Sequence, residues 1–202
     1  MRPKLYVILA GMMVAVMVVA ACMPAATTAS TKVLVERTTI PASGVPPTVA
    51  PTVETLPIDS YKDAIYQIDG KSIALVDGLS EAEAAPGSAS RIITRYFGND
   101  AIGDLNGDGK KDVAFLLTQD TGGSGTFYYV VVALRAATGY QGTNAVLLGD
   151  RIAPQTTNIE NGMVVVNYAE RKPDESFAIE PSVGISKYLA VIDCKLVEVN
   201  TQ

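Results

Sequence analysis

The chain has 202 residues, with 16 basic and 21 acidic side chains and a formal net charge of -5 at pH 7. It has no Lys/Arg-rich patch that could follow a phosphate backbone, so nucleic acid is not expected as a partner. It also has no histidine, which removes Ser-His-Asp and Cys-His catalysis, the usual zinc sites and the usual general base near neutral pH. The sequence therefore nominates no catalytic residue and leans toward a protein that is not an enzyme.

The N-terminus has the pattern of a secretory signal. Two basic residues, Arg2 and Lys4, precede an uncharged, largely apolar run over residues 5–21. The residues at 19–22, Val-Ala-Ala-Cys, resemble a bacterial lipobox. This resemblance implies removal of residues 1–21, diacylation of the Cys22 thiol and an extracytoplasmic protein anchored in the cell membrane or outer membrane, since one acyl chain alone anchors only marginally. The alternative is an uncleaved membrane helix, for which the 17 residues of the run are at the short end of the spanning range of about 17 to 25.

Residues 22–57 are predicted to form a tether between the lipid and a folded domain. The segment is crowded with Thr, Ser, Ala, Val and Pro and has no long periodic apolar pattern. As a flexible coil of about 35 residues, it would hold the domain about 30 to 35 Å from the membrane. The run Lys32–Glu36 has strand character but no evident pairing partner, so it is assigned to the tether. Without the signal, the mature chain has 14 basic and 21 acidic side chains and a formal charge of -7.

Residues 58–202 alternate strand-like runs with turn signals, which predicts one all-β domain. The nine runs are Ala64–Ile68, Ser72–Val76, Arg91–Phe97, Val113–Thr118, Phe127–Arg135, Ala145–Leu148, Met163–Tyr168, Ser186–Ile192 and Leu196–Val199. We expect a single compact antiparallel sandwich or barrel-like domain of about eight or nine strands. A chain of this length can bury a sizeable core without disulfides or a metal ion.

Turn and cap signals add local detail to this domain. Asp69-Gly70 and Asn161-Gly162 predict tight hairpins, because these pairs suit turns with positive φ. Ser80–Ala85 has the spacing of a capping box and predicts at most a minor helix, which Pro86-Gly87 would end.

The apolar pattern also predicts where individual strands lie. Val113–Leu117 and Tyr129–Leu134 are apolar on both faces and should be central, whereas Ile185–Leu189 alternates and should have one wet face. Tyr128 and Tyr129 place one ring on each side of their strand, so we expect one core ring and one surface ring. The alternative for this pair is a carbohydrate platform.

The stretch Gly103–Asp112, Gly-Asp-Leu-Asn-Gly-Asp-Gly-Lys-Lys-Asp, has the pattern of a calcium loop. Calcium takes about six to eight oxygen ligands, and side chains at relative positions 1, 3 and 5 of a tightly turning loop can point at one centre. A glycine at position 6 suits the sharp turn, and position 7 usually supplies a backbone carbonyl. The candidate ligands are therefore the side chains of Asp104, Asn106, Asp108 and Asp112 and the carbonyl oxygen of Lys110. Position 12 is Phe115 and the residues around it are strand-like, so the loop is not an EF-hand.

The loop at 104–112, which would connect two strands, resembles the calcium loop of FG-GAP and VCBS-type repeats. No second Asp-x-Asn-x-Asp-Gly occurs in the chain, so the resemblance does not imply a propeller. Over a longer span, Gly103–Val113, Gly122–Tyr129 and Leu148–Arg151 resemble a domain of uncharacterised bacterial lipoproteins, which implies no activity. We expect a structural calcium ion with a dissociation constant of about 0.1 to 1 mM. The alternative is a metal-free turn in which two lysines, at 110 and 111, neutralise the carboxylates.

Two other segments contain groups that could be reactive. Gly122–Thr126 lacks the final glycine of a nucleophile elbow and precedes a strand, so we interpret it as a hairpin connection. Cys194 follows Asp193, and this Asp-Cys pair is predicted to lie in a turn. With Cys22 lipidated, no disulfide is expected, and only Lys195 is adjacent to lower the pKa of the thiol, so a functional thiol is not favoured.

The sequence as a whole favours a lipid-anchored, non-enzymatic β domain that acts as a binding or assembly module of the cell envelope. Its partner would be an envelope protein or a glycan, and the cation loop would keep one hairpin rigid. The alternative is an envelope hydrolase or carbohydrate-active enzyme that uses carboxylates of the fold. A deep pocket with two carboxylates about 5 to 9 Å apart would favour the enzyme, and a filled sandwich with flat surfaces would favour binding.

Overall fold

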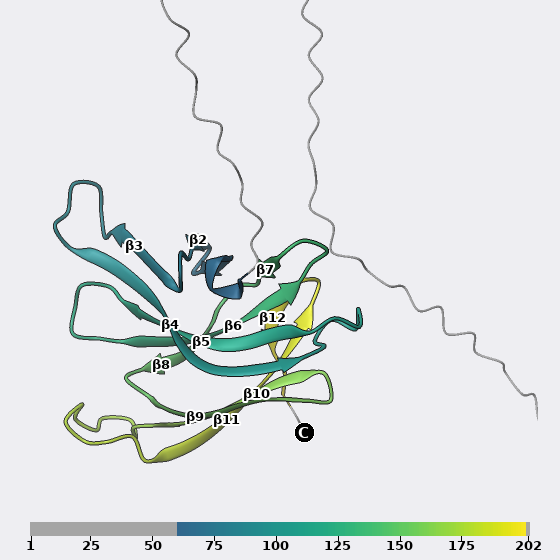
Figure 1. The fold of residues 1–202 in the computed structure, drawn as a ribbon. Coiled ribbons are helices and arrows are strands. Elements are labelled where there is room, and N and C mark those ends of the chain that lie inside the picture. Colours follow the sequence, from purple (N-terminus) through teal and green to yellow (C-terminus); the bar gives the residue numbers. More distant parts are fainter. Residues whose placement is uncertain (1–59, 201–202) are drawn as a thin grey trace, which may run out of the picture. The chain divides into compact units, whose positions relative to one another are not determined.

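The computed structural model describes residues 60–200, and this part of the chain is all-β, as predicted (Figure 1). The elements are η1 (Tyr61–Asp63, a 3-10 helix), β1 (Ile65–Ile68), β2 (Lys71–Ala74), β3 (Leu79–Glu83), β4 (Arg91–Gly103), β5 (Asp112–Asp120), β6 (Phe127–Arg135), β7 (Tyr140–Gly142), β8 (Val146–Asp150), β9 (Ala153–Glu160), β10 (Met163–Glu170), β11 (Val183–Ile192) and β12 (Lys195–Glu198). Within residues 60–200, no helix has the length and apolar character needed to cross a membrane. The signal peptide at 1–21, the acylated Cys22 and the tether at 22–57 lie outside the described residues and stay predictions.

The strands form three antiparallel sheets, which Figure 1 shows as layers. A central six-stranded sheet has the order β3-β4-β5-β6-β7, with β8 also paired to β6. The β1–β2 hairpin and η1 lie on one side of it, and a four-stranded sheet of order β12-β11-β10-β9 lies on the other. The predicted antiparallel sandwich is therefore present, with an additional small layer.

Each face of the central sheet carries its own apolar core. Along β5, Phe115 and Leu117 face the β1–β2 layer, whereas Ala114 and Leu116 face the four-stranded sheet. All four side chains are fully buried. Since a buried Val, Leu or Phe side chain contributes about 1.5–3 kcal/mol, strands with two apolar faces are stable only when both faces are covered. The prediction that Val113–Leu117 is central is confirmed, as is that for Tyr129–Leu134 in β6.

One short segment, which we call the Thr143–Asn144 junction, bonds to all three sheets. The Thr143 N–H donates to the Val132 carbonyl (2.9 Å), and the Thr143 carbonyl accepts from the Gln67 N–H (3.2 Å). The side chain of Asn144 donates to the Leu196 carbonyl (2.9 Å) and accepts from the Leu196 N–H (2.9 Å). These bonds join β6, β1 and β12, so the junction holds the layers in register where no strand ladder connects them.

Each of the nine predicted runs overlaps a strand, but the described residues contain twelve strands, so the expected count of eight or nine was too low. The additional strands are β3, β7 and β9. The prediction of a minor helix at Ser80–Ala85 is wrong, because most of this segment belongs to β3. Ser80 pairs with Thr94 in the β3–β4 ladder, and this long-range pairing overrides the local capping signal.

The tight turns form as predicted. Asp69 and Gly70 have φ angles of 50° and 75°, and Asn161 and Gly162 have 52° and 74°, which is the left-handed pair of a two-residue hairpin. Cys194 also lies in such a turn, between β11 and β12, with a φ of 60°. The alternation predicted for Ile185–Leu189 is present, because Leu189 is buried and Ser186 is exposed.

Gly142, just before the Thr143–Asn144 junction, provides a test of the contact between β1 and the central sheet. A Cβ atom there would lie 2.3 Å from the Ile65 carbonyl oxygen and 2.6 Å from the Tyr66 ring. Gly142→Ala should therefore lower the free energy of unfolding by at least about 2 kcal/mol in a urea titration, because β1 must move away.

Gly184→Ala is the matched control, since a Cβ at Gly184 meets nothing within 4 Å. Its free energy of unfolding should stay within about 0.5 kcal/mol of the wild-type value. Equal urea midpoints for the two variants would contradict the close passage of β1 over Gly142.

Candidate functional site

The calcium-type loop connects β4 to β5, and its base is part of the buried core. Leu105 is 6% exposed and packs between the central and four-stranded sheets. The carboxylate of Asp112 is fully buried and accepts two backbone hydrogen bonds, from Leu105 N–H (2.9 Å) and from Arg135 N–H (2.8 Å). The base of the loop is thus fixed both by apolar packing and by a buried acceptor.

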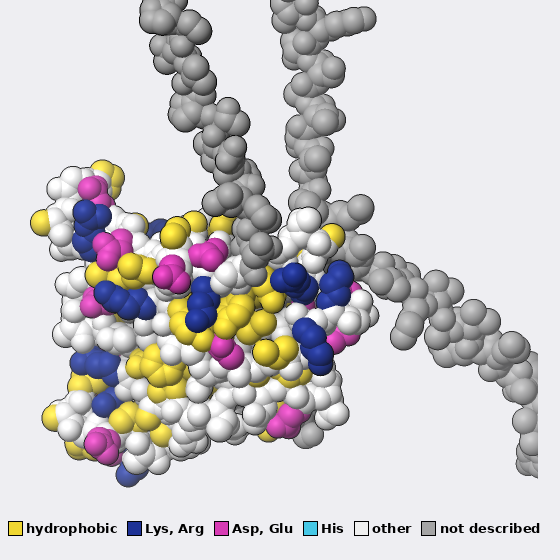
Figure 2. All heavy atoms as spheres, in the orientation of Figure 1, with side chains coloured by type: hydrophobic (Ala, Val, Ile, Leu, Met, Phe, Trp, Pro, Cys, Tyr) yellow, Lys and Arg dark blue, Asp and Glu magenta, His cyan; other side chains and the backbone are white. Residues whose placement is uncertain are grey.

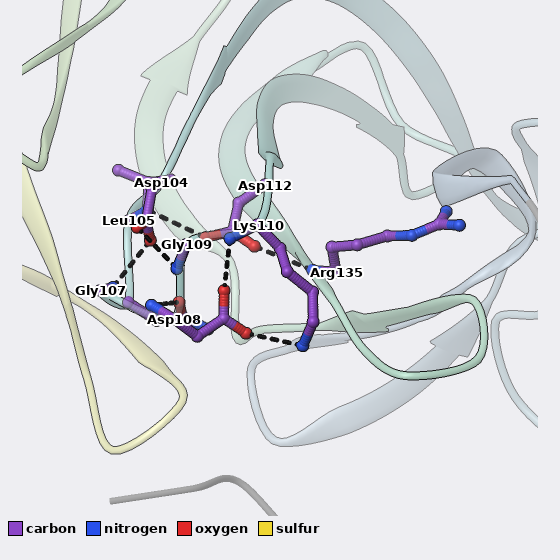
Figure 3. Close-up of polar contacts among 9 residues, drawn as sticks. Asp104, Leu105, Gly107, Asp108, Gly109, Lys110, Asp112 and Arg135 are labelled. Atoms are coloured by element: carbon purple, nitrogen blue, oxygen red, sulfur yellow. Dashed lines mark hydrogen bonds and ion pairs between the residues drawn. The ribbon is translucent and has the colours of Figure 1, made fainter. Parts of the chain in front are cut away.

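The rim of the loop is exposed and is organised by its own side chains (Figure 3). The carboxylate of Asp104 accepts from Gly107 N–H (2.7 Å) and Gly109 N–H (2.9 Å). The Asn106 side-chain oxygen accepts from the Asp108 N–H (3.0 Å). Gly107 and Gly109 have φ angles of 76° and 80°, which glycine adopts without strain.

Asp108 is paired with Lys110 within the loop. Its carboxylate accepts from the Lys110 N–H (2.9 Å) and from the ammonium Nζ (3.0 Å). The backbone bond, followed by the ammonium bond, holds the pKa of Asp108 below its ordinary value. Lys110 therefore neutralises one carboxylate, as the metal-free alternative expects.

Asp112 has the opposite electrostatic environment. Burial raises the pKa of its carboxyl group, and the negative charges of Asp108 and Asp104 add to this effect, while the two backbone hydrogen bonds oppose it. The loop thus concentrates negative charge around a carboxylate that water does not reach. A bound cation would offset this repulsion.

The donor chemistry of the loop fits a hard cation, whereas the side-chain positions are those of a hydrogen-bonded turn. Three carboxylates, one amide and one carbonyl are the oxygen ligands that calcium prefers. In the part of the chain that the structure describes, however, no three acidic or cysteine side chains are arranged to hold a metal ion. Asp104, Asn106 and Asp108 point at loop N–H groups, so they would have to rotate to share a cation.

The structure places all five predicted residues in this one loop and adds two that the sequence interpretation omitted. Leu105 anchors the loop, and its signal was an apolar residue inside an otherwise polar stretch. Arg135 holds Asp112 through its backbone and comes from the far end of β6, 23 residues away. No local pattern points to that contact.

Two further segments, Gly122–Tyr129 and Leu148–Arg151, were singled out in the sequence together with Gly103–Val113, and they meet at the opposite end of β5. Thr126 N–H donates to the Asp150 carboxylate (2.9 Å), and Arg151 N–H donates to the Thr126 carbonyl (2.7 Å). Arg151 also pairs with Asp150 (2.7 Å) and lies over the ring of Phe177 at 3.5 Å. These contacts close the β5–β6 connection, so Gly122–Thr126 is a hairpin connection, as predicted.

The tyrosine pair divides between the two faces of β6. Tyr129 is 6% exposed and belongs to the core under the β1–β2 layer. Tyr128 is half-buried on the other face, with its ring 5.3 Å from that of Phe97. The rings lie on opposite faces of the strand, as expected, but Tyr128 packs partly against the second core and is not a surface ring.

A polar hollow of about 240 Å³ lies between the Thr143–Asn144 junction and the β11–β12 turn. Among its described lining residues, Asp193 is the one carboxylic acid. Cys194 also lines it, and the expectation of no disulfide involves Cys22, which lies outside the described residues.

Comparison with protein-family models, curated proteins and solved structures gave no match to the chain.

Asp112→Asn tests the anchoring of the loop. Both carboxylate oxygens of Asp112 accept an N–H, and an amide offers one acceptor only, so one buried N–H would lose its partner. We expect the free energy of unfolding in urea to fall by about 1–3 kcal/mol. Asp174→Asn is the same chemical change in an exposed turn, and it should leave the free energy of unfolding within about 0.5 kcal/mol of the wild-type value. If the two variants are equally stable, Asp112 does not anchor the loop.

Proposed function

We propose that this chain is a lipid-anchored, extracytoplasmic β domain that serves as a non-enzymatic binding or assembly module of the cell envelope, with a structural calcium site in the 104–112 loop. The supporting observation is the position of Asp112, which is fully buried among like charges and joins the loop to β6. A cation there would act on the stability of the scaffold. The envelope partner would be a protein or a glycan.

The ligands of the cation would be the side chains of Asp104, Asn106, Asp108 and Asp112 and the Lys110 carbonyl. When bound, calcium supplies charge neutralisation and cross-links the two ends of the loop. Leu105 and the backbone of Arg135 hold the base of the loop in place, and the glycines at 107 and 109 allow the rim to turn. No substrate position is needed for this role.

The hydrolase alternative has little support from the hollow beside Cys194. A glycosidase needs two carboxylic acids about 5 to 9 Å apart. The described lining of this hollow provides Asp193 alone, and its other polar groups are amides, a hydroxyl and an ammonium. We therefore keep the binding or assembly role as the proposal.

Thermal unfolding of the full-length protein in detergent tests the calcium site. With a dissociation constant of about 0.1–1 mM, about 10 mM calcium stabilises the folded state by about 1.4–2.7 kcal/mol. The melting temperature should then rise by about 4–10 °C relative to chelator, and magnesium should give a smaller rise.

Asp108→Ala should abolish the calcium-dependent rise, because it removes a ligand from the exposed rim. Glu160→Ala, which removes an exposed carboxylate at the end of β9, should retain it. Identical melting curves in calcium, magnesium and chelator would leave the 104–112 loop as a metal-free turn stabilised by Lys110.

Intact mass spectrometry of the protein from a bacterial membrane fraction tests the anchor. The wild-type chain should begin at Cys22 and have the added mass of the acyl chains, and Cys22→Ser should lose both the added mass and membrane association. Cys194→Ser is the control and should stay acylated. A wild-type chain without acyl mass, in which reduction opens a Cys22–Cys194 disulfide, would refute the anchor.

A further inference from the structure

Two Asn-Gly pairs occur in the chain, Asn106-Gly107 in the 104–112 loop and Asn161-Gly162 in the β9–β10 turn. Such a pair can react with itself, because the glycine nitrogen can attack the carbonyl carbon of the asparagine side chain. Glycine has no side chain to hinder this approach. All four residues are exposed, so neither sequence nor exposure distinguishes the two pairs. Their hydrogen bonds do.

The reaction converts the asparagine amide into a succinimide ring and then needs only water. A bond forms between the glycine nitrogen and the side-chain carbonyl carbon, and the bond from that carbon to the amide nitrogen breaks. The amide nitrogen leaves as ammonia, with the proton that the glycine N–H gives up. Water then opens the ring at either carbonyl. The product is an aspartate, or an isoaspartate whose backbone runs through the former side chain.

In the 104–112 loop, both reacting groups are held by hydrogen bonds (Figure 3). The Gly107 N–H donates to the Asp104 carboxylate (2.7 Å), and a charged acceptor makes such a bond strong. The same carboxylate opposes loss of the Gly107 proton, because the negative charge left on the nitrogen would lie beside it. The Asn106 side-chain oxygen accepts from the Asp108 N–H (3.0 Å), which fixes the amide. Attack at Asn106 therefore requires the loop to open.

The β9–β10 turn leaves both reacting groups open to water. The ladder pair that closes this hairpin is Glu160 with Met163. Among the described residues, none forms a hydrogen bond with the Asn161 side chain or with the Gly162 N–H. Figure 2 shows the surface around this turn, at the lower right of the domain, as mostly backbone and uncharged polar atoms. Attack at Asn161 thus breaks no hydrogen bond of either group.

We propose that Asn161 is a site of spontaneous deamidation in the folded protein, whereas the loop protects the Asn106-Gly107 pair. This inference is independent of the lipid anchor and of cation binding. An aspartate product fits the turn, because Asp69-Gly70 forms the same turn with φ angles of 50° and 75°. An isoaspartate lengthens the backbone of a two-residue turn. Since turn length sets the register of a hairpin, the end of the β9–β10 hairpin then loosens.

Peptide mass spectrometry of the full-length protein measures conversion at each pair during incubation in detergent, chelator and mildly alkaline buffer. In the folded protein, Asn161 should convert at least about tenfold faster than Asn106, which is the factor that one charge-assisted hydrogen bond supplies. In urea the two pairs should convert at similar rates, because both are then open to water. The chelator keeps metal ions out of the comparison.

Asp104→Ala tests the protection of the loop directly. The variant removes the acceptor of the Gly107 N–H, so conversion at Asn106 in the folded protein should rise by about fivefold or more. Conversion at Asn161 should stay unchanged. Asp120→Ala is the matched control, because Asp120 also accepts a glycine N–H, that of Gly122 (2.8 Å), in the β5–β6 connection. It should alter neither rate.

Four results would overturn the inference. The first is conversion at Asn106 as fast as at Asn161 in the folded wild type. The second is conversion at Asn161 in urea but none in the folded protein, which would mean that the hairpin protects this pair too. The third is the same ratio of rates in urea as in the folded protein, since local sequence would then decide. The fourth is an unchanged rate at Asn106 in Asp104→Ala.

Discussion

The burial of β5 and β6 on both faces is the constraint on which the rest of the structure depends. Side chains such as Phe115 and Leu116 are fully buried on opposite sides of one strand. Water must therefore be excluded from both faces of the central sheet, and this requires a layer on each side. The β1–β2 hairpin with η1 covers one face, and the four-stranded sheet covers the other. Because strand ladders do not connect these stacked sheets, side-chain and loop contacts such as those of the Thr143–Asn144 junction supply hydrogen bonds between them.

The same constraint gives the cation loop two distinct parts. Asp112 is the first residue of β5 and lies fully within the buried region, whereas Asp108 lies on the exposed rim with Lys110. Charge at the rim is screened by water and by the lysine, but charge at the base is not. Any ligand that neutralises the loop therefore acts mainly on the buried residue, and through it on the core.

The sequence was sufficient where the chemistry is local. β6 was predicted with its observed bounds, Phe127–Arg135, because a run of apolar and β-branched residues ends at clear turn signals. The strand at Leu79–Glu83 was missed because its capping-box spacing favours a helix locally, and only the pairing of Ser80 with Thr94 decides otherwise. β9 was missed because its exposed face is polar, with glutamine, asparagine and threonine side chains. The oxygen-bearing residues of the loop could be identified, but the bond from Arg135 depends on how β6 ends beside β5.

Asn144 has a consequence for how copies of this protein meet. A strand at the edge of a sheet exposes N–H and C=O groups to which a strand of another chain can bond, and this is a common route to aggregation. On the outer edge of β12, Asn144 already occupies both backbone groups of Leu196. Asn99 similarly reaches the Gln155 carbonyl of β9, at the other edge of the same sheet. At these two positions an asparagine side chain occupies backbone groups at the sheet edge, which are then not open to a strand of another copy.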